Sequence, residues 1–154
     1  NARKNIFAFS LPYVKNRQVI LVRLDSPIQS KADLKGKKVA VQKGSTSAEF
    51  VRAMSGEDAP AEVKDFDVRS EQFLAVMKGL VDATVMDSTL VDYYVANSPG
   101  KFRILKDSLQ EEEFGIAVRP NDTELLAKIN KALTEMEADG TSQAIYQRWF
   151  SAKQ

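Results

Sequence analysis

The chain has 154 residues, a formal net charge of +1, and neither histidine nor cysteine. Without these residues, disulfides, thiolate catalysis and cysteine-based metal sites are excluded, and catalytic triads and zinc hydrolases lose their usual side chains. Lysine and arginine form no concentrated block, which argues against nucleic-acid binding, and no apolar run approaches the roughly 20 residues of a membrane-spanning helix.

The first part of the chain predicts alternating strands and helices. Apolar runs indicate strands at residues 18–23, 38–41, 63–68 and 83–86. Helical spacing follows the last three of these strands, at residues 48–54, 70–79 and 89–95. Ser70 is the expected cap of the second helix, and Gly79 its expected end. This alternation indicates an α/β fold with a mainly parallel sheet covered by helices.

The last part of the chain predicts two further strands and two amphipathic helices. The strands are expected at residues 102–105 and 114–118. Between them, Glu111–Glu113 is expected to be a solvated acidic turn, and the alternative is that the three carboxylates attract a divalent cation weakly. Because no second ligand cluster accompanies them, we expect no metal site. We also expect no cofactor. A helix capped by Asp122 and ended by Gly140 follows, and a shorter helix at residues 142–150 completes the pattern.

Two of the predicted strand ends carry residues suited to binding a small charged molecule. Loops at the carboxyl ends of parallel strands converge on one crevice. The loop Gly44–Ser47 offers backbone N–H groups and hydroxyls at a helix start, where an anion such as a carboxylate would fit, although serine and threonine are also ordinary helix caps. Asp87 ends the strand at residues 83–86 and would pair with an ammonium group, or cap the next helix.

Arg3 is the third candidate. Its guanidinium group can hold a carboxylate through two parallel hydrogen bonds, each contributing about 1.5–3 kcal/mol when it is shielded from water. The alternative interpretation is a solvated surface arginine, which is the usual state of this residue type.

Several segments, in order, resemble the bacterial extracellular solute-binding proteins for polar amino acids, which have the type II periplasmic-binding-protein fold. They comprise Arg3 with residues 7–13, and residues 33–47, 81–87, 114–118 and 135–150. The resemblance covers essentially the whole chain. It implies one complete, mainly parallel α/β lobe and the C-terminal remnant of a second lobe.

The resemblance also implies a role for each candidate residue. Arg3, Thr46 and Ser47 would hold the α-carboxylate of the ligand, and Asp87 would accept its α-ammonium group. Gln42 and Met86 fall at positions that contact the side-chain end of the ligand in such proteins.

Family members begin with a longer N-terminal part, so the resemblance implies that this chain is N-terminally truncated. Residues 1–16 would be the remnant of lobe 1 with the first hinge strand, and residues 17–111 would form a complete lobe 2. Residues 112–154 would form the second hinge strand and the C-terminal helices of lobe 1. Because the apolar faces of these helices would lack a sheet to cover, self-association or a domain swap is expected.

The implied function is binding of a free L-amino acid between two lobes, without catalysis, for uptake through an ABC-transporter permease. The implied location is the periplasm or the cell exterior, with a lipid anchor in a full-length protein. One alternative is the ligand-sensing ectodomain of a receptor or kinase. Another is a dehydratase on the same fold.

Overall fold

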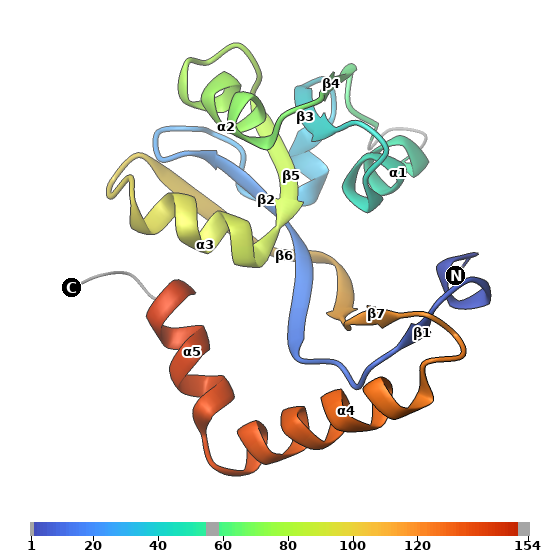
Figure 1. Cartoon of the computed structure of the whole chain (residues 1–154). Helices are drawn as coiled ribbons and strands as arrows, with labels where there is room; N and C mark the ends of the chain where they lie inside the picture. Colours follow the sequence, from blue (N-terminus) through green and yellow to red (C-terminus); the bar gives the residue numbers. More distant parts are fainter. Residues whose placement is uncertain (1, 55–58, 151–154) are drawn as a thin grey trace. The chain divides into compact units, whose positions relative to one another are not determined.

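The computed structural model describes residues 2–54 and 59–150, apart from the side chains of residues 2, 3, 108 and 110 (Figure 1). The chain divides into two compact units, with boundaries between residues 16 and 17 and between residues 111 and 112. Unit 2 contains residues 17–111, and unit 1 contains the residues before them and those from residue 112 through the C-terminal helices.

Unit 2 is built on a sheet with the strand order β4-β3-β5-β2-β6. The strands are β2 (Val14–Arg23), β3 (Lys38–Gln42), β4 (Glu62–Phe66), β5 (Ala83–Asp87) and β6 (Phe102–Phe114). Strand β3 is parallel to both of its neighbours, β4 and β5, as the alternation of strands and helices predicts. Strand β2 is antiparallel to β5, and this pairing was not part of the sequence prediction.

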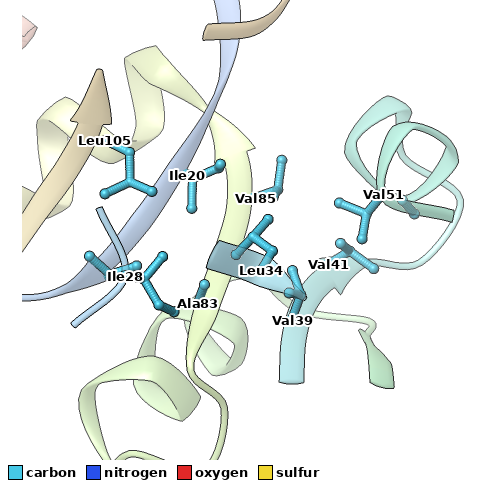
Figure 2. Packing of buried hydrophobic residues seen from close by; sticks show 11 residues of the cluster. Ile20, Ile28, Leu34, Val39, Val41, Val51, Ala83, Val85 and Leu105 are labelled. Carbon is cyan, nitrogen blue, oxygen red and sulfur yellow. The ribbon is translucent and has the colours of Figure 1, made fainter. Parts of the chain in front are cut away.

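Alternation of apolar side chains along the strands gives this sheet two buried faces. Val39 and Val41 point to one face and Ala40 to the other, as expected when successive strand residues alternate. The first face packs against helix α1 (Thr46–Ala53) and Leu34 of the short helix η2 (Lys31–Leu34) (Figure 2). The second packs against α2 (Arg69–Met77) and α3 (Ser88–Ala96). The α/β core therefore lies within unit 2.

Unit 1 contains a two-stranded antiparallel ribbon and two helices. Strand β1 (Ala8–Phe9) pairs with β7 (Ala117–Val118), and the short helix η1 (Ala2–Asn5) precedes them. Helices α4 (Thr123–Ala138) and α5 (Thr141–Phe150) contain no fully buried residue in the described part of the chain. No helix in the described segments is both long enough and apolar enough to cross a membrane.

Two local predictions were wrong. Glu111–Glu113 is not a turn, because strand β6 runs without a break from Phe102 to Phe114. Within this strand, Glu112 Oε2 accepts a hydrogen bond of 3.1 Å from Asn16 Nδ2 of the neighbouring strand β2. The acidic side chain thus has a polar partner across the sheet, and the charged run is compatible with a strand.

Ser70 is not the cap of α2. The helix begins one residue earlier, at Arg69, with Val68 as its N-cap. The carbonyl oxygen of Val68 accepts from the N–H groups of Glu71 and Gln72, at 3.2 and 3.3 Å, which places Ser70 inside the first turn. The predicted helix ends at Gly79 and Gly140 are confirmed, and both glycines have positive φ, at 70° and 81°.

Candidate functional site

The loop between β3 and α1 is shaped by a glycine and capped by a serine. Gly44 has φ of 69°, a conformation that side chains with a Cβ rarely adopt. Ser45 is the N-cap of α1: its Oγ accepts from the N–H of Ala48 at 3.2 Å and donates to the carbonyl oxygen of Gln42 at 2.7 Å. The capping role expected for this loop is therefore filled by Ser45, and not by Thr46 or Ser47.

Thr46 and Ser47 present their backbone N–H groups at the first turn of α1. The described residues supply no recorded hydrogen-bond acceptor for either group, as is usual for the first amides of a helix. Thr46 is exposed, whereas Ser47 is buried, with its Oγ 2.7 Å from that of Ser45. The positive end of the helix dipole adds to these donors, so this turn can bind an anion.

Asp87 lies at the junction of β5 and α3, and its side chain is 16% exposed. It occupies the N-cap position of α3 without a capping hydrogen bond from its side chain. Instead, Oδ1 accepts a hydrogen bond of 2.7 Å from Gln18 Nε2, and Oδ2 lies 3.3 Å from Nη1 of Arg69. The carboxylate therefore faces polar groups from β2 and α2.

Gln18 connects the two candidate binding groups. Its Nε2 also lies 3.4 Å from Thr46 Oγ1, within hydrogen-bond distance, and its side chain is 1% exposed. One buried amide thus contacts both the helix start that can bind an anion and the carboxylate that can bind a cation. The structure brings Thr46 and Asp87 together around this amide, and their roles in ligand binding stay predictions.

Gln42 joins the same cluster through Arg69. The Oε1 atom of Gln42 accepts a hydrogen bond of 2.6 Å from Arg69 Nε, and the same guanidinium group reaches Asp87. Met86 is placed differently: it is 3% exposed and packs in the second apolar cluster, with Val19 as its partner on the adjacent strand. A contact between Met86 and a ligand stays a prediction.

The side chain of Arg3 lies outside the described residues, and only its backbone, in η1 of unit 1, is placed. Its predicted grip on a carboxylate stays a prediction. No group of three or more acidic side chains in the described segments could hold a metal ion.

The sequence interpretation did not identify Gln18 or Arg69 as site residues. Gln18 begins an apolar run and looks like part of an ordinary strand. Arg69 carried a local signal that could have been used, because a cation in the first turn of a helix opposes the helix dipole and needs a compensating partner.

Comparison with known proteins gives consistent results. The family model for bacterial extracellular solute-binding proteins, family 3, matches residues 1–152. An ABC transporter arginine-binding protein from Escherichia coli (strain K12) is 30% identical over 96% of this chain and 61% of its own length. An ABC transporter glutamine-binding protein from Bacillus subtilis (strain 168) is 34% identical over 96% of this chain and 53% of its own length.

Among solved structures, an ancestral arginine-binding protein bound to arginine superposes with a TM-score of 0.82. It is 43% identical, and the match covers 98% of this chain and 67% of that protein. The chain thus spans between about half and two thirds of these three proteins.

Proposed function

The chain belongs to family 3 of the bacterial extracellular solute-binding proteins, and on that premise we propose that it binds a free L-amino acid for uptake by an ABC transporter. Its fold is of the type II periplasmic-binding-protein class. Support for the ligand class comes from relatives described as arginine-binding, glutamine-binding and cystine-binding proteins.

The chemistry of the cluster in unit 2 suits the two charged groups that every free amino acid carries. The α-carboxylate would accept hydrogen bonds from the N–H groups of Thr46 and Ser47 at the positive end of α1. The α-ammonium group would pair with Asp87, whose charge is shielded from water on most sides. The observation that carries this proposal is the contact of the single amide of Gln18 with both Thr46 and Asp87.

The proposed partner is the permease of an ABC transporter, and the proposed location is the periplasm or the cell exterior. Both follow from the family and from the relatives, which are binding components of such transporters. Attachment of a full-length protein to the membrane through a lipid belongs to the same proposal. Because these relatives are binding proteins and not enzymes, we propose binding without a chemical step.

Two substitutions at Thr46 separate its backbone donor from its hydroxyl. Thr46→Pro removes the N–H group at the first position of α1, where proline fits a helix, and the extended backbone of Ser45 suits a residue before proline. Thr46→Val removes the hydroxyl and keeps the N–H group. Asp87→Asn removes the charge that would hold the ammonium group.

Isothermal titration calorimetry of the chain with the common L-amino acids tests the proposal. For the amino acid that binds most tightly, Thr46→Pro and Asp87→Asn should each weaken binding by about tenfold or more, and Thr46→Val should weaken it less. Asp65→Asn is the control, because Asp65 pairs with Arg52 outside the cluster. If the unchanged chain binds no amino acid, or if affinity survives in both Thr46→Pro and Asp87→Asn, the proposal is wrong.

A further inference from the structure

Arg69 contacts two residues that are assigned to the ligand, Asp87 by the proposed function and Gln42 by the family resemblance. Its Nη1 lies 3.3 Å from Asp87 Oδ2, the acceptor proposed for the α-ammonium group. Its Nε donates to Gln42 Oε1 at 2.6 Å, and the resemblance assigns Gln42 to the side-chain end of the ligand. The guanidinium group therefore lies between the acceptor of the ammonium group and the position where the ligand side chain would extend.

The guanidinium group of Arg69 has binding capacity left over. It carries five N–H donors, and Nη2 has no recorded partner in the described part of the chain. The Arg69 side chain is 46% exposed, so a ligand can reach its guanidinium group from the solvent side, and a ligand ammonium group can replace it as the partner of the less exposed Asp87. Arg69 is thus accessible to a ligand while Gln42 holds it in position.

The local field around Arg69 favours a negative or oxygen-bearing group. Arg69 is the first residue of α2, where the partial positive charge of the helix dipole adds to the charge of the guanidinium group. Within the described residues, Asp87 is the one carboxylate recorded at ion-pair distance from Arg69. A ligand whose ammonium group takes Asp87 therefore leaves Arg69 without its counter-charge.

The consequence differs between classes of amino acid. A ligand with a cationic side chain would bring a second positive charge toward Arg69 while its ammonium group competes for the same carboxylate. A side chain that ends in a carboxylate or carboxamide would instead give Arg69 a new oxygen acceptor in place of Asp87.

We propose that Arg69 determines the specificity of this site, favouring L-amino acids whose side chains end in an oxygen acceptor and disfavouring those with cationic side chains. The inference rests on the proposed function, because it assumes that the ammonium group of an amino acid binds Asp87.

Calorimetric titration of the full chain and its Arg69→Gln variant with L-glutamate, L-glutamine, L-arginine and L-lysine tests the inference. The unchanged chain should bind glutamate or glutamine at least about tenfold more tightly than arginine or lysine, and Arg69→Gln should reduce this ratio by about tenfold or more. Comparison of glutamate with glutamine shows whether charge or hydrogen bonding contributes more. Arg52→Gln is a matched control, because the Arg52 side chain is 45% exposed and pairs with Asp65 outside the cluster.

The outcomes separate the inference from the function on which it rests. Binding of arginine or lysine in preference to both oxygen-bearing ligands would leave the function standing and overturn the inference. An equal loss of affinity for all four ligands in Arg69→Gln would also overturn it, since that result indicates only structural support. Absence of binding to any of the common L-amino acids would reject the proposed function, and the inference with it.

Discussion

The side-chain amide of Gln18 donates a hydrogen bond of 2.7 Å to the carboxylate of Asp87, and the two residues are directly opposite each other on the antiparallel strands β2 and β5. The strand pairing fixes this contact, although 69 residues separate the partners. Gln18 is 1% exposed, and a buried side-chain amide needs hydrogen-bond partners within the protein. Asp87 and Thr46 provide them.

Replacement of Gln18 by leucine should destabilise the fold. Leucine keeps most of the volume but removes a donor from the largely buried carboxylate of Asp87, so we expect the free energy of unfolding to fall by about 1–3 kcal/mol. Urea denaturation measures this change. Gln29→Leu is the matched control, because the Gln29 side chain is exposed, and it should change stability by less than about 0.5 kcal/mol. If Gln18→Leu lowers the free energy of unfolding no more than Gln29→Leu does, the Gln18 contact makes no net contribution to stability.

Removal of the Leu34 side chain tests the core on the α1 face. Leu34 is fully buried in the first apolar cluster, next to Val39 and Val41 in the close-up view (Figure 2). Leu34→Ala should lower the free energy of unfolding by about 2–5 kcal/mol, because the loss of buried surface adds to the cost of a cavity. Leu80→Ala serves as the control, since Leu80 is 60% exposed. A loss below about 1 kcal/mol for Leu34→Ala would contradict the packing described here.

Most strands and helices of unit 2 were predictable because burial against the sheet determines which of their residues are apolar. The continuous apolar run of 39–41 reflects a strand buried on both of its faces, and the helical spacing of 70–79 reflects a helix packed on one face of the same sheet. Strand β6 was ended too early because the charged run Glu111–Glu113 near its C-terminal end looks like a turn, whereas pairing with β2 decides its conformation. A local pattern does not contain that long-range pairing.

The candidate site was predictable to the same extent. Thr46 and Asp87 follow strand ends, and the convergence of such ends in parallel sheets is a general rule. Gln18 does not follow a strand end, because it lies within strand β2. The antiparallel pairing of β2 with β5, which places Gln18 opposite Asp87, cannot be predicted from the local sequence. Arg69 reaches Gln42 and Asp87 only after three separate elements have packed, so its contacts depend on the tertiary fold.

Asp33 should make stability depend on pH in the acidic range. Its Oδ2 accepts hydrogen bonds of 2.9 Å from the N–H groups of both Gln29 and Ser30, and these bonds lower the pKa of Asp33 below its ordinary value of 3.8. The stabilising contribution is therefore present above pH 3.8 and is lost as the pH falls through the lower pKa of the folded protein.

Thermal unfolding of Asp33→Asn, measured across this range, tests that prediction. The variant should melt below the unchanged chain at neutral pH, and the gap should narrow in acid. Asp67→Asn, at an exposed position close to α2, is the control. A gap that stays constant from neutral pH into strong acid would show that the effect of Asp33 does not come from its charge.

Asp92 should affect stability with the opposite sign. Burial raises the pKa of Asp92 above 3.8, and the positive charge of Arg17 opposes that shift. Its contribution is fully present below pH 3.8 and is lost as the pH rises through the raised pKa. At neutral pH, Asp92→Asn should therefore raise the free energy of unfolding, by less than about 1 kcal/mol because the side chain is only half-buried.

Urea denaturation of Asp92→Asn at neutral pH and below pH 3.8 measures this effect. The gain should disappear at the lower pH, where aspartate and asparagine are both neutral. Loss of stability at neutral pH would mean that attraction between Asp92 and Arg17 outweighs the burial of the carboxylate.

Unit 1 leads us to expect self-association. Large apolar side chains of this unit are exposed, including Trp149 at 62%, Ile145 at 46% and Leu125 at 44%. Ile145 and Trp149 are four residues apart on α5 and share one face of that helix, so they form an apolar stripe that water solvates poorly. We expect the chain to sediment as a dimer or larger species at micromolar concentration, because burial of these side chains between copies would contribute about 1.5–3 kcal/mol for each one.

Sedimentation velocity over a range of concentrations tests this expectation. Trp149→Glu should shift the chain toward the monomer, because association would then bury a charge. Leu80→Glu is the control, since Leu80 is exposed to a similar degree but belongs to unit 2. A folded monomer at all micromolar concentrations would contradict the expectation. If Trp149→Glu and Leu80→Glu shift the chain toward the monomer equally, the association does not depend specifically on the apolar face of α5. Since the cluster of Thr46, Asp87 and Arg69 lies wholly in unit 2, neither result would change the test of ligand specificity.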